Sequence, residues 1–144
     1  MPEKETLKRA RRDKREGKAP STQAGEFVRE EIEHIREGKH GARSTKQAIA
    51  IGLSKARRAG VNLPPSKGSS EETKEQAERD IRKARTGGKK SAKRSRATRK
   101  ALKREGRSAA SKEALSTQAR KAARKRSAAS RSRSAKKAAA TRKK

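Results

Sequence analysis

The sequence contains no cysteine, no tryptophan and no tyrosine, and its one phenylalanine is Phe27. The lack of cysteine excludes disulfide bonds, thiolate zinc sites and a cysteine nucleophile. The scarcity of aromatic side chains argues against proteins that read RNA or single strands by stacking bases, such as recognition-motif domains and oligonucleotide-binding barrels. Two common routes to nucleic-acid recognition are therefore disfavoured.

Large apolar residues are also scarce, because most of the 27% hydrophobic fraction is alanine. Only 14 residues are Met, Leu, Ile, Val or Phe, and nine of them lie between Phe27 and Leu63. The longest apolar run, 48–53, is far below the roughly 20 residues that span a bilayer. The first residues lack the apolar segment of a secretory signal. We therefore expect no membrane contact and a cytoplasmic protein.

No constellation of residues predicts catalysis: there is no nucleophile–base pair, Walker loop or dinucleotide fingerprint. The five glutamates in residues 26–37 suggest acid–base chemistry, but on a surface helix we expect them to pair with Arg29 and Arg36 or with the basic tail of the chain. His34 and His40, with no cysteine nearby, favour hydrated side chains or a phosphate contact over a metal site. We expect no enzymatic activity, no cofactor and no bound metal.

What the sequence has in excess is positive charge. Its 45 Lys and Arg residues against 16 Asp and Glu give a net charge of +29 over 144 residues. Residues 87–144 hold 23 of these cations and only two acidic residues, Glu105 and Glu113, whereas residues 69–86 carry five charges of each sign. A chain this basic needs a polyanionic partner, and DNA and RNA are the densest polyanions in a cell. Because a tail that follows a phosphate backbone needs no base stacking, we prefer duplex DNA over RNA.

The central residues predict a helical hairpin. Ser21 or Thr22 can cap a first helix that runs to about Glu37. The apolar face of this helix carries Ala24, Phe27, Val28, Ile32 and Ile35 at helical spacing.

A second helix begins at Ser44, which forms a capping box with Gln47, and runs to about Ala59. Gly52 in its apolar stripe lets the two backbones approach closely. Ile51 points to another side of the same helix. We therefore expect either a third helix on the hairpin or a homodimer through Ile51.

The flanking segments predict less structure. Residues 70–85 can form a third helix, and residues 2–16 a charged helix with little to bury. From residue 89 onward, dense like charge predicts disorder, with segments such as 111–126 becoming helical on phosphates. The predicted fold is all-α: a small helix-loop-helix hairpin with a possible third helix, flanked by a disordered basic N-terminal arm and a long Lys/Arg/Ala/Ser tail. The corresponding divisions are a basic N-terminal arm (1–20), the hairpin core (21–63), a linker and charge-balanced helix (64–86) and a disordered basic tail (87–144).

The loop between the two hairpin helices is a candidate phosphate site. Residues 38–41 have the Gly-x-x-Gly spacing that lets backbone N–H groups approach phosphates, and they lead into the helix N-terminus at Ser44. Alternatively, Gly38 is only a helix C-cap and Gly41 a turn residue. A helix-turn-helix that places Ser44, Lys46 and Gln47 in the major groove is a further alternative. The residues that we expect to contact nucleic acid are Lys39, Arg43, Ser44, Lys46, Arg57 and Arg58 in the hairpin, and Lys89, Lys90, Lys93, Arg94, Arg96, Arg99, Lys100, Arg120, Lys121, Arg124, Lys125, Arg126, Arg131, Arg133, Lys136 and Lys137 in the tail.

The stretch from Ser21 to Val61, STQAGEFVREEIEHIREGKHGARSTKQAIAIGLSKARRAGV, resembles the core of a family of small basic bacterial proteins. Their function is uncharacterised, and they are commonly labelled DNA-binding or plasmid-stabilization proteins. The likeness extends less closely to NLPP, QAERD and the SAAS and STQARKAAR elements of the tail. It implies a bacterial, cytoplasmic setting and supplies no catalytic or binding residues. The tail is also similar in composition to linker-histone C-termini.

The sequence thus predicts a non-sequence-specific DNA-binding protein of the nucleoid-associated type. Its tail would neutralise phosphates, and its hairpin would position or dimerise the tail. One alternative is an RNA- or ribosome-associated basic protein of the same physical type. A second alternative is a hairpin that binds a protein partner while the tail only localises it.

Overall fold

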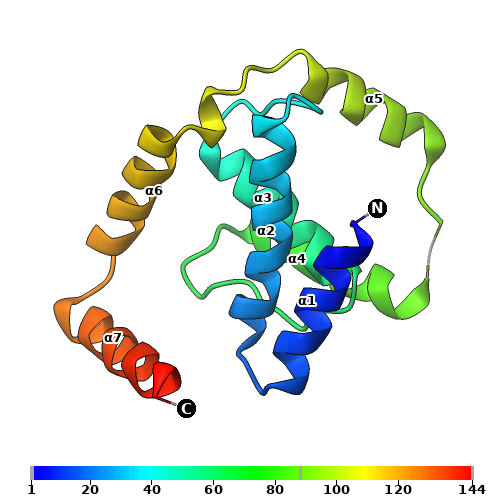
Figure 1. Ribbon diagram of the computed structural model, residues 1–144. Coiled ribbons are helices and arrows are strands. Elements are labelled where there is room, and N and C mark those ends of the chain that lie inside the picture. Colours follow the sequence, from blue (N-terminus) through cyan, green and yellow to red (C-terminus); the bar gives the residue numbers. More distant parts are fainter. Residues whose placement is uncertain (1, 88, 144) are drawn as a thin grey trace.

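A computed structural model describes residues 2–87 and 89–143 of the chain. The described residues form seven α-helices and one short 3-10 helix, η1 (Figure 1). The elements are α1 (Lys4–Arg15), α2 (Pro20–Arg36), α3 (Thr45–Arg58), α4 (Glu71–Thr86), α5 (Ala92–Lys103), η1 (Ser108–Ala110), α6 (Lys112–Arg124) and α7 (Ala128–Arg142). We call α1–α4 the bundle and residues 89–143, which carry α5–α7, the basic arms.

Helices α2 and α3 form the predicted hairpin and share the largest helix–helix contact of the described chain. Phe27 lies in its core at 1% exposure. A Cβ atom on Gly52 would lie 2.6 Å from the Cα atom of Val28, so the predicted close approach of the two backbones is confirmed. The N-terminus of α3 is capped as expected, because Ser44 Oγ accepts a hydrogen bond from the backbone N–H of Gln47 at 3.2 Å.

Alanine supplies most of the core. Eight of the twelve buried apolar residues of the described chain are alanines. One cluster, between α1, α2 and the end of α3, contains Ala10, Ala24, Phe27, Ala56 and Val61. A second, at the loop end of the hairpin, contains Ile32, Ile35, Ala42, Ala48, Ala109 and Ala110. Small side chains let the helices approach closely, so a sequence with few large apolar residues still forms a packed interior.

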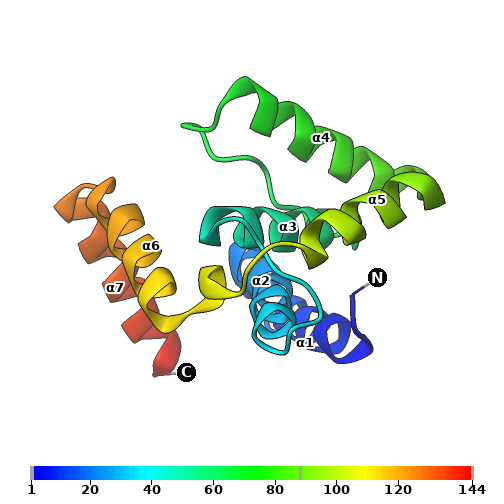
Figure 2. The same ribbon diagram turned by 90° about the horizontal axis from the view of Figure 1, so that it is seen from above.

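The expectation of a disordered N-terminal arm is wrong, because α1 packs along α2 (Figure 2). Thr6 and Ala10 are buried on this face. Arg9 Nε donates to Glu26 on α2 at 2.6 Å, and Lys18 Nζ donates to the buried Asp13 at 2.7 Å. Ion pairs with α2 and with the following loop therefore help to hold a helix that has little apolar surface of its own.

Helix α4 docks on α3, so the possible third helix of the sequence analysis is present and packed. Asp80 of α4 is fully buried and accepts hydrogen bonds from Ser54 Oγ at 2.6 Å and from Arg58 Nε at 2.8 Å. Ala77 is buried one turn earlier. Ile51 is half-buried on α3, and a homodimer through it stays a prediction.

The expectation of a disordered basic tail is also wrong. Each of α5, α6 and α7 begins directly after a serine, namely Ser91, Ser111 or Ser127, whose Oγ accepts a backbone N–H three residues further on. Alanine, lysine and arginine all favour helix. A serine cap contributes about 1 kcal/mol and adds to this propensity, and the two together oppose the roughly 0.2–0.5 kcal/mol lost for each like-charged pair on a helix. The predicted disorder rested on like-charge repulsion alone and did not include these serine caps.

Residues 102–110, which we call the tether, join the basic arms to the bundle. The backbone N–H of Gly41 donates to the carbonyl oxygen of Leu102 at 2.8 Å, and that of Ala42 donates to Gly106 at 3.1 Å. A Cβ atom on Gly41 would overlap the carbonyl oxygen of Glu105, so this contact requires glycine.

The end of the tether closes the apolar core. Thr45 Oγ1 donates to the carbonyl oxygen of Ala109 at 2.7 Å, and Arg36 Nε donates to that of Ala110 at 3.0 Å. Both alanines are buried, and Leu115 in the first turn of α6 packs against the same cluster. The basic arms are therefore part of the packed fold from the tether to Leu115.

Beyond these anchors, the helices of the basic arms project away from the bundle. Both views show α5 on one side and α6 with α7 on the other (Figures 1 and 2). No residue of α5, α6 or α7 is buried. Within residues 2–87 and 89–143, no helix has both the length and the apolar character needed to cross a membrane.

Candidate nucleic-acid interface

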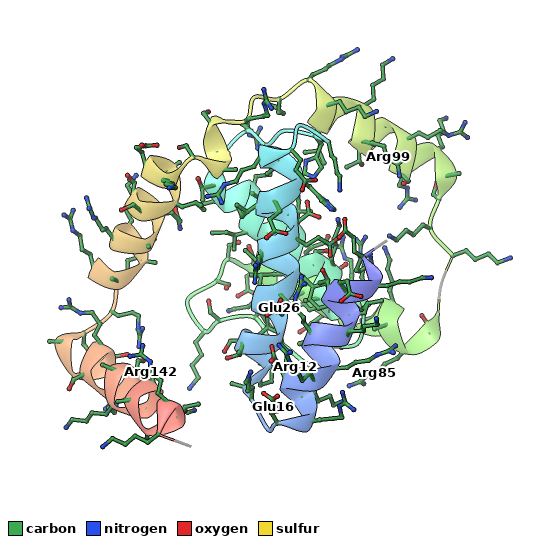
Figure 3. All side chains as sticks on the ribbon, viewed as in Figure 1. Arg12, Glu16, Glu26, Arg85, Arg99 and Arg142 are labelled. Atoms are coloured by element: carbon green, nitrogen blue, oxygen red, sulfur yellow. The ribbon has the colours of Figure 1, made fainter. Side chains whose placement is uncertain are left out.

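Ion pairing divides the chain into two parts. Every ion pair and every histidine–carboxylate contact among the described residues joins side chains that lie between Glu3 and Asp80. In the described part of the basic arms, no lysine or arginine pairs with a carboxylate. Figure 3 shows many side chains with nitrogen tips along α5 and α7, on which Arg99 and Arg142 are labelled. The positive charge of this region is therefore uncompensated.

Helix α5 presents a continuous cationic stripe. Arg96, Arg99, Lys100 and Lys103 follow the i, i+3, i+4, i+7 spacing that places side chains on one helix face. All four are exposed. The first three are among the expected contacts named individually from the sequence, and the helical phase places Lys103 on the same face.

Helices α6 and α7 carry the remaining predicted cations of the tail. On α6, Arg120, Lys121, Arg124 and its C-cap neighbour Lys125 occupy one half of the helix surface. Arg126 instead lies against α7, where its guanidinium donates to Ser130 and Ser134. The exposed cations of α7 among the predicted contacts are Arg131, Arg133, Lys136 and Lys137.

Positive charges also gather where the start of the basic arms meets α3. Partial desolvation lowers the pKa of Lys90, and the charges of Arg58, Lys55 and Arg99 lower it further. Lys89, Lys93 and Arg94 are exposed on either side of it. Like charges held this close repel one another, so an anion placed among them would be stabilised.

The loop between α2 and α3 does not offer the expected phosphate cradle. The backbone N–H groups of Gly41 and Ala42 are used by the tether. The backbone N–H of Arg43 donates to Gln47 Oε1 at 2.6 Å. Lys39 pairs with Glu37 at 3.1 Å and with Glu3 at 3.3 Å, and these two carboxylates raise its pKa.

Of the hairpin residues named from the sequence, Arg43, Ser44 and Lys46 are exposed together at the start of α3. Arg57 and Arg58 serve the fold instead. Arg57 is 9% exposed, its Nε donates to the carbonyl oxygen of Leu63 at 2.8 Å, and burial lowers its pKa. The guanidinium of Arg58 holds the buried Asp80 of α4.

The expectation that the α2 glutamates lie on the surface is only partly met. Glu33 pairs with Arg29 at 3.0 Å, as expected. Glu30 and Glu31, however, are buried at 2% and 1% exposure. Glu30 accepts from the backbone N–H of Glu3, which starts the segment covering it.

The two histidines are enclosed beside these carboxylates instead of being hydrated. Each histidine side chain is 14% exposed. His40 Nε2 lies 3.0 Å from Glu31 Oε2, and Lys55 Nζ contacts the other oxygen of the same carboxylate. No sequence signal links these residues, because three separate segments contribute them.

Comparison with known proteins gives a match to part of the chain. Residues 4–67 match a family of unknown function, DUF6496. No curated protein and no solved structure gives a match. The matched residues cover α1, α2, α3 and the segment that follows α3, which are the residues that hold most of the ion pairs. They include none of the basic arms, and the family description assigns no activity to the matched part.

Proposed function

We propose that this protein binds duplex DNA without sequence specificity and neutralises its phosphates through the basic arms, as nucleoid-associated proteins do. The supporting observation is that the lysines and arginines of the described residues 89–143 have no carboxylate partner, whereas the ion pairs of the described chain all lie within residues 3–80. Because the chain resembles small basic bacterial proteins labelled DNA-binding, we also place it in the bacterial cytoplasm. We propose no catalytic role.

Phosphate binding would relieve a cost that the basic arms carry when free. Arg96, Lys100 and Lys103 are like-charged neighbours on one helix face, and each such pair disfavours the helix by roughly 0.2–0.5 kcal/mol. Phosphates between them turn repulsion into attraction and release condensed counterions from the duplex. DNA is therefore expected to stabilise α5–α7 as helices.

The bundle would fix the positions of the basic arms relative to each other. The tether fixes the end of α5 and the start of α6 on the loop end of the α2–α3 hairpin. The two arms consequently leave the bundle in different directions (Figure 1). Such an arrangement lets one molecule contact phosphates on both sides of its anchoring point.

A salt titration of binding tests this proposal. The affinity of the full chain for duplex DNA and for structured RNA is measured from low to physiological salt by fluorescence anisotropy. With eight contacts the log–log slope on duplex DNA would be roughly −7, because each neutralised phosphate contributes about −0.9. Stronger binding to RNA under the same conditions would favour the RNA-associated alternative.

A charge-neutralised variant locates the interface. Glutamine replaces Arg96, Arg99 and Lys100 on α5 and Arg133, Lys136 and Lys137 on α7. The slope should fall by roughly 5, and the affinity at low salt by about a thousandfold or more.

A matched control removes the same number of charges from the bundle. Glutamine replaces six exposed cations of α1: Lys4, Lys8, Arg11, Arg12, Lys14 and Arg15. This variant should keep most of the slope. A larger loss in the control than in the arm variant would place the interface on α1 and contradict the proposal. Truncation at residue 86 is unsuitable, because it removes Ala109 and Ala110 from the core.

A further inference from the structure

A carboxylate–histidine cluster lies at the junction of α2, the following loop and α3. Glu31, His34 and His40 each offer one ligand atom, and these atoms all lie within 4.8 Å of one another. Glu31 is 1% exposed, and its Oε2 accepts no hydrogen bond from any of the described residues. An unpartnered carboxylate oxygen in the interior is costly unless a charged group satisfies it.

The hydrogen bonds around the two histidines fix which ring nitrogens face this oxygen. His40 Nδ1 lies 2.9 Å from the carbonyl oxygen of Gly41, which can only accept, so Nδ1 carries the hydrogen. His34 Nε2 lies 2.9 Å from a carboxylate oxygen of Glu3, so Nε2 carries the hydrogen there. In neutral rings the lone pairs therefore belong to His40 Nε2 and His34 Nδ1.

Both lone pairs lie on the side of Glu31. His40 Nε2 is 3.0 Å from Glu31 Oε2, and His34 Nδ1 is 3.9 Å from Glu31 Oε1. Ligand atoms on a tetrahedral zinc ion, with bonds of about 2.0–2.1 Å, are about 3.4 Å apart. The 3.0 Å separation is close to this ligand spacing and the 3.9 Å separation is longer, and with neutral rings no hydrogen lies between His40 Nε2 and Glu31 Oε2.

The outer hydrogen bonds match those of metal-binding histidines. Such histidines donate their second ring N–H to a carboxylate or a backbone carbonyl, which orients the ring. The carboxylate of Glu3 is the acceptor for His34, and the carbonyl oxygen of Gly41 is the acceptor for His40. From these observations we infer that Glu31, His34 and His40 form a binding site for a divalent transition-metal ion of the zinc type, with water at a fourth position.

The positive charge of Lys55 would compete with a metal ion for the Glu31 carboxylate, and this competition provides a test of the site. Its ammonium group contacts Glu31 Oε1 and shares the carboxylate with the metal. Replacing Lys55 by methionine keeps every ligand and removes the competing positive charge. The variant should bind the metal more tightly, by about tenfold. In a cluster held only by ion pairs, the same change would merely reduce the free energy of unfolding.

The experiment titrates the full chain with Zn²⁺ by calorimetry, against a chelator of known affinity and without DNA. One equivalent should bind to the wild type. His40→Gln should weaken binding by about a hundredfold or more, and Glu3→Gln by roughly tenfold. The control Glu33→Gln, an exposed carboxylate of the same helix, should change the affinity less than twofold.

A second probe reads the coordination directly. Co²⁺ should give intense visible absorption bands with the wild type and lose them with His40→Gln. Circular dichroism establishes that each variant is folded, and Lys55→Met supplies the decisive measurement if His40→Gln does not fold. The proposal would be overturned if the wild type did not bind Zn²⁺ or if a folded His40→Gln variant still bound it. It would also be overturned if Lys55→Met showed no gain in affinity.

Discussion

The bundle and the basic arms are both helical, yet they are stabilised in different ways. In the bundle, distant side chains satisfy one another, as Arg9 does with Glu26 and Arg58 with Asp80. In α5 and α7 the helices depend on their serine caps and on intrinsic propensity, since none of their residues is buried. A strongly basic sequence can therefore form helices without a core of their own. Among the described residues of the basic arms, the tether and Leu115 provide the apolar contacts with the bundle.

The largest expected effect comes from separating the two regions. Gly41→Ala places a Cβ atom on the Glu105 carbonyl oxygen and should detach the tether from the loop. We expect a loss of about 3 kcal/mol in the free energy of unfolding, because the overlap is with backbone and Ala109 leaves the core. Urea denaturation measures this loss. The control Gly68→Ala, which meets no atom within 4 Å, should change stability little.

A smaller effect is expected from disturbing the bundle alone. Gly52→Ala forces α3 away from Val28 on α2 and should cost about 2 kcal/mol. Gly25→Ala is the matched control, because Gly25 lies inside α2 with no atom near its Cβ position. That change should stabilise the protein by up to about 1 kcal/mol. Equal effects of the two substitutions in thermal unfolding would contradict the close helix contact.

The same cap substitution should act differently in the anchored and the free arm. Ser111→Ala removes the cap of α6, whose Leu115 packs on the core, and should lower global stability by about 1 kcal/mol. Ser127→Ala removes the cap of α7, which has no buried residue, and should reduce only the local helix content. Chemical denaturation and amide hydrogen exchange distinguish the two outcomes. A drop in global stability for Ser127→Ala would mean that α7 packs on the bundle.

The smallest expected effect is on the free energy of unfolding between pH 2 and pH 7. Hydrogen bonds from His34 and then from Lys39 lower the pKa of Glu3 below its ordinary value of 4.5. Because this pKa is lower in the folded state, the stabilisation is present at neutral pH and is lost as the pH falls through the folded-state pKa. Glu3→Gln should therefore be less stable than the wild type near pH 7 and equal to it in strong acid. Unfolding curves across pH 2–7 test this, with Glu5→Gln as the control.

The hairpin could be predicted because its signals are local. Phe27 and its apolar neighbours repeat at helical spacing, Ser44 caps the second helix, and Gly52 lies in the apolar stripe. The burial of Glu31 could not be predicted, because its partners come from residues that are distant in sequence, such as Lys55. A buried carboxylate and an exposed one look alike when only the helical phase is known.

The tether was missed for a related reason. Ala109 and Ala110 lie within a stretch whose composition is that of a basic tail, and nothing around them indicates burial. Their place in the core depends on packing against Ile35, Ala42 and Ala48, which are distant in the sequence. For the interface, the cationic residues of α5–α7 were evident from charge, whereas the internal roles of Arg57 and Arg58 depend on tertiary contacts.

The tether also sets the order in which a nascent chain can fold. Thr45 and its partner Ala109 are 64 residues apart, and Arg36 and Ala110 are 74 apart. At roughly 5–20 residues per second, the ribosome needs several seconds to deliver the second partner after the first. During that interval the α2–α3 hairpin is present with one end of its interior open to solvent. Synthesis of the most basic part of the protein is therefore also the step that closes its core.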